Sequence, residues 1–320
     1  MMKILITGAT GLIGKAITHL FLKEGISVNY LTTKKAKIKN ELNYQGFYWE
    51  PSTNKIDPKC FEGVTAIINL AGASIAKRWT KSYKKEILTS RINSLNTLYI
   101  ALESLKPEKK IALISASAIG IYPNSLSNFY TEDETKKDAS FLGEVTELWE
   151  KEMDKFKEIN CPVTKIRIGL VLSSEGGALP NITQAVTRYL GASFGSGRQW
   201  QSWIHVNDLA RMFLFIMENN LSGVYNGVAP NPVTNTKMLK ELAKILDKPL
   251  FMPNIPQFLM RLALGEMSYL LFVSQRVSSK KIEKEGFNFD YNNICRALEN
   301  IYLEEINKDN MDDVPAREYV

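Results

Sequence analysis

The sequence has few cysteines and histidines, and it lacks a long apolar run. Three cysteines and two histidines occur in 320 residues, and Cys60, Cys161 and Cys295 are widely spaced without a CxxC motif. This pattern excludes a disulfide framework and a zinc site, so we predict reduced packing cysteines and no bound metal. The N-terminus shows no export signal, and no stretch is apolar enough to span a bilayer. We therefore predict a cytoplasmic protein without a membrane partner.

The chain also lacks an acidic excess. Its net charge of +6 comes from lysines spread along the sequence. One denser stretch, KRWTKSYKK at residues 77–85, alternates basic residues with Trp79 and Tyr83, a pattern that can mark nucleic-acid contact. Because no nucleic-acid-binding module accompanies it, a solvated helix face near a phosphate-bearing ligand is the favoured interpretation. We predict no nucleic-acid partner.

Short apolar runs alternate with segments of helical period in the first half of the chain. Strands are expected at residues 3–7, 27–31, 66–70, 111–117 and 163–172, and helices at residues 14–25 and 89–105. Nearly continuous apolar strands separated by helices are typical of a parallel sheet covered on both faces. The predicted fold class is α/β, with a Rossmann-type doubly wound parallel sheet.

The composition changes after Leu172, where glycine-rich loops precede a helical C-terminal third. We predict a dinucleotide-binding domain at residues 1–172, completed by about 200–230, and a smaller C-terminal α/β substrate lobe at residues 173–199 and 231–303. Residues 304–320 are polar and are expected to form a tail.

The segment TGATGLIG places three glycines directly after the first expected strand and at the start of a helix. There, glycines allow a tight turn and a close approach of the backbone to a pyrophosphate at the helix N-terminus. The sequence thus predicts a dinucleotide site; the alternative is a purely structural turn. The loop residues expected to contact the cofactor are Gly8, Thr10, Gly11, Leu12, Ile13 and Gly14.

The end of the second strand distinguishes the two dinucleotides. An acidic residue there binds the ribose hydroxyls of NAD, whereas basic or hydroxyl-bearing residues accept the 2′-phosphate of NADP. Here the chain has Thr32, Thr33, Lys34 and Lys35, and the next carboxylate is Glu41. The predicted cofactor is NADP(H). The alternative is that the lysines only solvate the surface.

Further motifs resemble the extended short-chain dehydrogenase/reductase family over most of the chain: NLAG, RINSLNT, SASA and GSGRQWQSWIHVNDLA. A wider set, including FYWEP, GGALP and LGEMSYLLFVSQRVSSKKIEKEGFNF, is similar to its atypical subgroup called epimerase family proteins, which end in a domain of unknown function. The resemblance implies NADP(H) binding, an unidentified small-molecule substrate and a monomer or homodimer. It also implies that the cofactor is lined by Thr32, Thr33, Leu70, Ala71, Gly72, Glu86, Arg91, Ser115 and Val171.

The acid/base pair of that family is missing. In the family, a tyrosine about 25 residues past a serine, with a lysine four residues later, exchanges a proton with the substrate. Ser117 matches the serine, but the pair's positions hold Leu142 and Thr146, on one predicted helical face with Val145 and Trp149. Tyr30 is the only tyrosine in the chain with a lysine four residues later. We expect a largely apolar stripe facing the nicotinamide.

Asn93 and Ser117 match the remaining catalytic positions of the resemblance, and Tyr122 and His205 are candidates for the missing proton donor. Tyr122 is equally compatible with a wall of the site. His205 precedes an Asn/Asp helix cap, so a structural role is favoured for it.

Substrate contacts are predicted in the segment GSGRQWQSW. Arg198 and Gln199 are suited to an anionic or polyhydroxylated group, and Trp200 to a flat wall, with His205 nearby.

Two functions remain open. One is an NADP(H)-dependent oxidoreductase or epimerase-like enzyme for a small polar or sugar-like substrate, with the proton delivered through water or another side chain. The other is a non-catalytic NADP(H)-binding sensor or regulatory protein. Asn93 and Ser117 favour the enzyme, whereas the missing pair favours the regulator.

Overall fold

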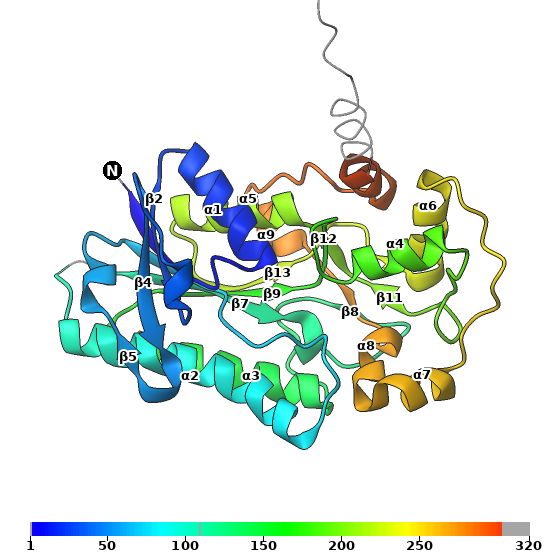
Figure 1. Cartoon of the computed structure of the whole chain (residues 1–320), viewed down its shortest axis with the longest axis horizontal. Helices are drawn as coiled ribbons and strands as arrows, with labels where there is room; N and C mark the ends of the chain where they lie inside the picture. Colours follow the sequence, from blue (N-terminus) through cyan, green and yellow to red (C-terminus); the bar gives the residue numbers. More distant parts are fainter. Residues whose placement is uncertain (1, 109, 303–320) are drawn as a thin grey trace, which may run out of the picture.

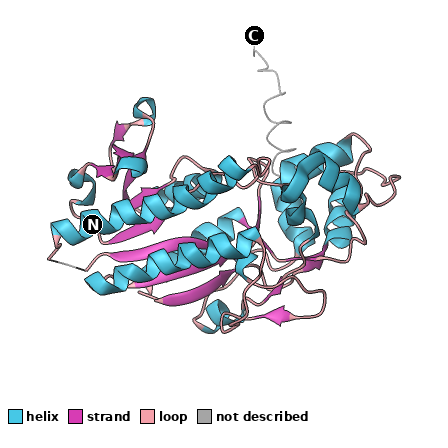
Figure 2. Ribbon diagram, turned by 90° about the horizontal axis from the view of Figure 1, so that it is seen from below, coloured by secondary structure: helices cyan, strands magenta, loops and turns pink. Residues whose placement is uncertain are grey.

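The computed structural model describes residues 2–108 and 110–302 (Figure 1). A nine-stranded sheet runs through the larger part of the molecule, with helices on both faces, and a group of helices lies at one end (Figure 2). The predicted α/β class with a doubly wound, mainly parallel sheet is confirmed. The predicted polar tail, residues 304–320, lies outside the described residues.

The body of the sheet consists of parallel strands that wind outward from the first one. Ile4 of β1 is in register with Val28 of β2 on one side and with Ala66 of β6 on the other. In spatial order the parallel strands are β13 (Gly223–Gly227), β9 (Val163–Ile168), β7 (Ala112–Ala118), β6 (Ala66–Asn69), β1 (Lys3–Thr7), β2 (Ser27–Thr32) and β4 (Tyr44–Glu50). Two short strands, β3 (Asn40–Glu41) and β5 (Lys55–Ile56), pair antiparallel with β4.

Two helical layers bury the sheet. One layer contains α1 (Leu12–Lys23) and α5 (Val206–Glu218), and the other contains α2 (Lys81–Leu105) and α3 (Phe141–Asp154) (Figure 1). Each layer encloses its own apolar cluster, around Phe213 on the first face and around Phe156 on the second. Residues of β1, β2 and β6 are therefore almost entirely buried. This explains the nearly continuous apolar runs of β1 and β6, whereas β2 also buries the polar residues Ser27, Asn29 and Thr32.

The strand expected at residues 163–172 is two strands, β9 and β10 (Leu170–Leu172). Between them, the amide of Gly169 donates to Gly227 O and the amide of Leu170 donates to Ser202 O. The chain thereby leaves the main sheet and pairs with β12 (Trp203–His205). A Cβ on Gly169 would lie 2.3 Å from Ser202 O, so the crossing requires glycine. The strand β4 had no counterpart among the expected strands.

The C-terminal part packs around a separate apolar cluster that contains Trp203 and Leu298. The helices that build this cluster are α4 (Leu179–Thr187), α6 (Asn235–Ile245) and a helix at residues 294–302. The same part of the chain contains α7 (Gln257–Leu264), α8 (Tyr269–Phe272) and α9 (Lys280–Lys284), and Ile282 of α9 packs in the cluster around Phe213. Short strand pairs join this part to the rest: β11 (Trp200–Gln201) with β14 (Val233–Thr234), and β15 (Arg276–Val277) with β8 (Phe129–Tyr130). The 3-10 helices are η1 (Lys35–Lys37), η2 (Pro51–Thr53), η3 (Pro58–Phe61), η4 (Ile119–Ile121), η5 (Lys155–Ile159) and η6 (Gly265–Ser268).

The basic stretch at residues 77–85 leads into α2, which starts after the cap residue Thr80. Trp79 is buried, and Tyr83 donates its hydroxyl to Ser74 O (2.6 Å). The buried Trp79 ring is therefore not a free platform for a base, and Lys77 Nζ lies 5.4 Å from the centroid of the half-buried Tyr83 ring. None of the helices in residues 2–108 and 110–302 is long and apolar enough to cross a membrane. The three cysteines are free thiols, and Cys60 and Cys161 are buried.

Candidate cofactor and reaction site

A glycine turn joins β1 to α1. Gly8 has a φ of +73°, and a Cβ on Gly14 would lie 2.2 Å from Gly8 O, so no larger residue fits there. A Cβ on Gly8 would lie 3.0 Å from the carbonyl of Leu70, so the loop after β6 packs against the turn. Gly11 is the N-cap of α1 and has no side chain to occupy the first N–H groups of the helix. The turn fits a pyrophosphate at the N-terminus of α1.

A hydrogen-bonded cluster fixes the loop after β6. Thr7 Oγ1 donates to Asn69 Oδ1 (2.7 Å) and accepts from the amides of Leu70 (3.0 Å) and Ala71 (3.1 Å). Asn69 Nδ2 donates to Ser115 Oγ (3.0 Å). The ends of β1, β6 and β7 are thus tied together beside the glycine turn. Three residues predicted at the cofactor, Leu70, Ala71 and Ser115, belong to this cluster.

The end of β2 carries hydroxyl and amino groups. Thr32 is buried, and its Oγ1 accepts from the amide of Lys34 (3.2 Å). Thr33 and Lys34 are exposed, and Lys35 Nζ lies 5.2 Å from the centroid of the Tyr48 ring. No carboxylate occurs among residues 32–35. This arrangement is suited to a phosphate on the adenosine ribose.

A cavity of about 220 Å³ lies at the ends of β7 and β9. Leu142, Val145, Thr146 and Trp149 of α3 all line it, so their predicted grouping on one helical face is confirmed. Thr146 Oγ1 donates to Leu142 O (2.7 Å), so this hydroxyl is engaged within its own helix. The other apolar walls come from the segment after β7, the crossing between β9 and β10, and the region of α8: Ala118, Ile119, Ile168, Leu170, Leu270 and Val273.

Arg91 is the one charged residue among the described residues that line this cavity. Its Nη1 donates to Ala73 O (3.2 Å) and Ile87 O (2.8 Å), and its Cζ lies 5.0 Å from the centroid of the Trp149 ring. Burial lowers the pKa of Arg91 to about 10, so the group is still a cation at neutral pH. A Cβ on Gly72 would lie 3.1 Å from Arg91 Cζ. The loop after β6 therefore packs closely against the guanidinium.

Two further residues predicted at the cofactor lie outside this cavity lining. Glu86 is exposed on α2. Val171 lies in β10, and a Cβ on Gly177 would meet both Val171 O (3.5 Å) and Leu12 Cδ2 (3.6 Å). Val171 is therefore near the start of α1, on the side of the glycine turn.

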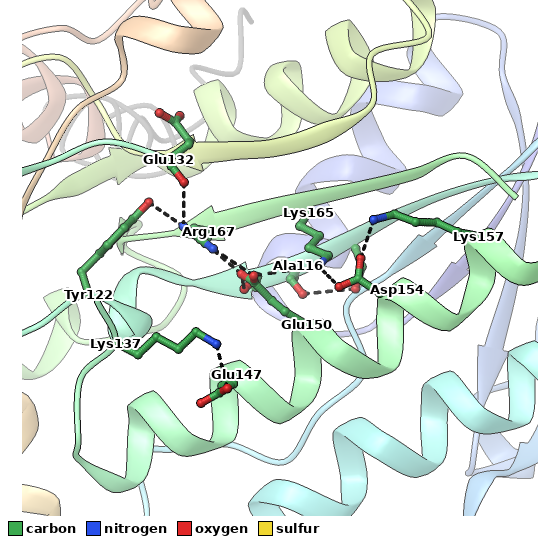
Figure 3. A network of polar contacts seen from close by, with 12 residues as sticks. Ala116, Tyr122, Glu132, Lys137, Glu147, Glu150, Asp154, Lys157, Lys165 and Arg167 are labelled. Atoms are coloured by element: carbon green, nitrogen blue, oxygen red, sulfur yellow. Dashed lines mark hydrogen bonds and ion pairs between the residues drawn. The ribbon is translucent and has the colours of Figure 1, made fainter. Parts of the chain in front are cut away.

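Ser117 takes part in a buried ion pair. Its hydroxyl donates to Glu150 Oε1 (2.6 Å), and Arg167 donates to both oxygens of the same carboxylate, Nε to Oε1 (2.9 Å) and Nη2 to Oε2 (3.0 Å) (Figure 3). Burial favours a higher pKa for Glu150, but the hydrogen bonds and charge of Arg167, with Ser117 and Lys165, hold the pKa below its usual value. The family resemblance predicted that Ser117 is a catalytic residue at the substrate. In the structure its hydroxyl binds Glu150, and the neighbouring Ala118 lines the cavity instead.

Tyr122 belongs to the same network. Its hydroxyl donates to Asn226 Oδ1 (2.7 Å) and accepts from Arg167 Nη1 (3.0 Å), and its ring stacks on Tyr130 with centroids 5.3 Å apart. Burial raises the pKa of Tyr122 to about 12, although Arg167 opposes the shift. A buried phenol with this pKa is a poor proton donor at neutral pH. These contacts argue against Tyr122 as the proton donor, and the residue does not line the cavity.

We expected Asn93 to be the residue of α2 at the site, but its neighbour Ser94 is the one that reaches it. Asn93 is half-buried, and its backbone carbonyl accepts from Thr97 Oγ1 (2.8 Å). Ser94 reaches the cluster beside the glycine turn, where its hydroxyl donates to Asn69 Oδ1 (3.2 Å). The motif gave the position along α2 but not the rotation of the helix. A small polar residue on the buried face of α2 is the signal that identifies Ser94.

One of the four residues predicted at the substrate, Trp200, lines the cavity. Arg276 Cζ lies 4.6 Å from the centroid of its ring, a contact for which the sequence gave no signal. Arg198 is exposed and is not among the lining residues. Gln199 is buried, and its amide donates to the backbone carbonyls of Phe194 and Leu271. The Gln199 side chain therefore has a structural role, because it links two backbone segments.

His205 is the N-cap of α5. Its Nδ1 accepts from the amide of Asn207 (3.1 Å), and its ring stacks on Tyr291 with centroids 4.0 Å apart. Burial lowers the pKa of His205 to about 4, so the ring is neutral at neutral pH. These contacts agree with the structural role favoured for His205, but the cap is His205 itself and not the Asn or Asp that follows it. The residue does not line the cavity.

A larger cavity, of about 610 Å³, lies between α1 and α5, where Lys15, His19 and Arg211 line it. It includes neither the apolar face of α3 nor the end of β7, so the smaller cavity is the candidate reaction site. Within the described ranges, no three side chains among His, Cys, Asp and Glu gather in a way that could hold a metal ion.

Known proteins match the chain along its length. The NAD dependent epimerase/dehydratase family matches residues 4–227, and a domain of unknown function, DUF1731, matches residues 255–301. An epimerase family protein of Staphylococcus aureus (strain NCTC 8325) is 36% identical over 305 residues, which cover 95% of this chain and 100% of the relative.

Two solved structures are similar as well. A human epimerase family protein (isoform 2), solved with NADPH, has 26% identity and a TM-score of 0.80, covering 94% of this chain and 99% of its own. A nucleoside-diphosphate sugar epimerase of Corynebacterium glutamicum has 27% identity and a TM-score of 0.74, covering 94% of this chain and 58% of its own.

Proposed function

Because the chain belongs to the NAD dependent epimerase/dehydratase family, we propose that it is an NADP(H)-dependent oxidoreductase or epimerase-like enzyme whose reaction takes place in the cavity at the ends of β7 and β9. One observation carries this proposal: the loop after β6 connects the two parts of the site. Leu70 packs against Gly8 of the glycine turn, and Ala73 O accepts from Arg91, which lines the cavity. A dinucleotide bound along this loop reaches the cavity.

The preference for NADP(H) over NAD(H) is supported by the end of β2. Thr32, Thr33 and Lys34 offer hydroxyl and amino groups, and no carboxylate is present there to repel a 2′-phosphate. The human relative solved with NADPH points in the same direction. The glycine turn would hold the pyrophosphate, and Arg91 would lie near the nicotinamide end.

The cofactor supplies or accepts a hydride when bound; the chain must position the substrate and manage the proton. Among the described lining residues there is no tyrosine, histidine, cysteine, lysine or carboxylate. We propose that water delivers the proton, and that the Arg91 cation stabilises negative charge on a substrate oxygen. From the sequence we expected a small polar or sugar-like substrate. The mostly apolar walls support a small substrate with one polar end, held near Arg91.

A non-catalytic NADP(H) sensor is the second candidate. The observation that favours it is the same lining, because it contains no side chain able to exchange a proton near neutral pH. A sensor needs only to bind the dinucleotide and to change a contact elsewhere.

Deuterium transfer separates the two functions. Purified protein is saturated with NADPH that is deuterated at one face of C4 in one sample and at the other face in a second sample. Each sample is mixed with a small-metabolite extract, and the products are analysed by mass spectrometry. We expect label from one face only in one metabolite. An epimerase that returns its hydride internally is detected in the same samples by interconversion of two isomers. Saturation with NADPH but neither result would favour the sensor, and failure to bind NADPH would refute both functions.

A further inference from the structure

Two tryptophans line the reaction cavity, and each has a guanidinium group over its ring. Arg91 Cζ lies 5.0 Å from the Trp149 centroid, and Arg276 Cζ lies 4.6 Å from the Trp200 centroid. Neither arginine takes part in an ion pair of the described residues. Guanidinium stacking orients an aromatic ring. The cavity thus has two oriented flat walls beside positive charge.

One of these rings has an unused hydrogen-bond donor. Trp149 is 6% exposed, and its Nε1 is buried without a hydrogen-bond partner in the described part of the chain. Leaving a buried N–H unpaired is costly, and such groups normally find a partner. Trp149 lines the cavity, so a bound molecule that carries an oxygen acceptor and reaches this edge of the ring would supply the missing partner.

Three of the four other polar side chains in the lining are already engaged, and the fourth is the Gln201 amide. Thr146 Oγ1 donates to Leu142 O, Ser202 Oγ donates to Gln275 O, and Gln275 Nε2 donates to Tyr122 O. A ligand with many hydroxyl groups would find few partners here. A flat ligand with one or two acceptor oxygens would find stacking surfaces, the Trp149 N–H and a cation.

The absence of a proton donor in the lining restricts the acceptor further. After hydride transfer, the acceptor oxygen carries negative charge until water protonates it. A phenol-type oxygen bears this charge readily, since its conjugate acid has a pKa of about 10, whereas the oxygen of a simple alcohol is far more basic. Arg91 stabilises the charge while it lasts.

We propose that the substrate is a flat, conjugated two-electron acceptor of the quinone type, stacked against the tryptophan wall that Trp200 forms; this rests on the proposed NADP(H)-dependent oxidoreductase function. The acceptor gains one hydride, which NADPH supplies when bound, and one proton from water. The quinone becomes a hydroquinone, and NADPH becomes NADP⁺. Arg276 orients Trp200, and Arg91 faces the developing charge.

A binding experiment tests whether a quinone stacks on the tryptophan wall, and it does not depend on turnover. Duroquinone is titrated into protein saturated with NADP⁺; its ring carbons are all substituted, so it does not add to cysteines. We expect saturable binding that weakens about tenfold in Trp200→Ala and is retained in Trp200→Phe, which keeps a flat ring. Both variants should bind NADP⁺ like the wild type, which also shows that they are folded. No saturable binding, or equal binding in Trp200→Ala, would overturn the proposal.

Turnover then tests the acceptor class. Anaerobic oxidation of NADPH is followed with duroquinone, with cyclohexanone and with D-glyceraldehyde, a polyhydroxylated aldehyde. We expect oxidation of NADPH with duroquinone alone. Equal or faster reduction of cyclohexanone or glyceraldehyde would overturn the quinone assignment but leave the oxidoreductase in place. If NADPH itself does not bind, the proposed function fails first, so the two failures are distinguishable.

Discussion

Removal of the Ser117 hydroxyl tests whether this residue supports the fold or the reaction. Ser117 is 3% exposed, and its hydroxyl donates to Glu150 Oε1 at 2.6 Å. The Ser117→Ala variant loses one hydrogen bond to a buried carboxylate, which costs about 1.5–3 kcal/mol of unfolding free energy. Arg167 keeps both of its bonds to Glu150, so the carboxylate stays ionised and the site keeps its shape.

The assay is equilibrium denaturation in guanidinium chloride, together with NADPH titration. We expect a loss of about 2 kcal/mol for Ser117→Ala and an unchanged NADPH affinity. Arg167→Met should cost about 3–5 kcal/mol, because it removes both bidentate bonds and leaves the buried Glu150 with only Lys165, at 4.0 Å, as a counter-charge. Ser104→Ala is the matched control, because Ser104 is exposed and its hydroxyl donates to Ile100 O of its own helix (2.8 Å). Its effect should lie within about 0.5 kcal/mol.

A different ranking would refute this reasoning. If Ser117→Ala is as stable as Ser104→Ala but lowers turnover of the substrate found by deuterium transfer, the hydroxyl acts in the reaction. The catalytic interpretation drawn from the family resemblance would then be correct, and the partner seen at Glu150 would be incidental.

Three other changes give further expected outcomes. Gly14→Ala puts a Cβ 2.2 Å from Gly8 O, so NADPH binding measured by fluorescence should be lost; wild-type affinity would show that the turn is not the cofactor site. Lys34→Glu places a carboxylate where we expect the 2′-phosphate, so the ratio of NADPH to NADH affinity should fall at least about tenfold; an unchanged ratio would contradict the NADP(H) assignment. His205 has a pKa of about 4 in the fold against 6.5 normally, so its contribution to stability is complete above pH 6.5 and is lost as the pH falls towards 4. His205→Asn retains a cap for Asn207 but does not titrate, so its stability should fall less over that range; parallel pH curves would contradict this account.

Elements with a strong local signal were predictable from the sequence. Strands β1 and β6 are buried on both faces and therefore nearly continuously apolar. The glycines of the turn are required by contacts as close as that between Gly14 and Gly8. The same holds for α3, where helical spacing alone grouped Leu142 with Thr146. In contrast, β4 is only partly buried and lacks a continuous apolar run.

Side-chain direction was not predictable where it depends on distant parts of the chain. Ser117 turns to Glu150 because Arg167, on the neighbouring strand, holds that carboxylate, and no local pattern connects a helix glutamate to a strand arginine. The rotation of α2 similarly decides that Ser94, and not Asn93, reaches the cluster. Family motifs gave the positions of these residues along the chain, whereas their contacts come from tertiary packing.

A crystal structure of the NADPH complex is the most direct measurement of the central claim. We predict the pyrophosphate at the glycine turn around Gly11, the 2′-phosphate beside Lys34, and the nicotinamide ring in the cavity next to Leu142 and Thr146. A nicotinamide ring bound elsewhere, for example in the larger cavity between α1 and α5 that Arg211 lines, would contradict the account.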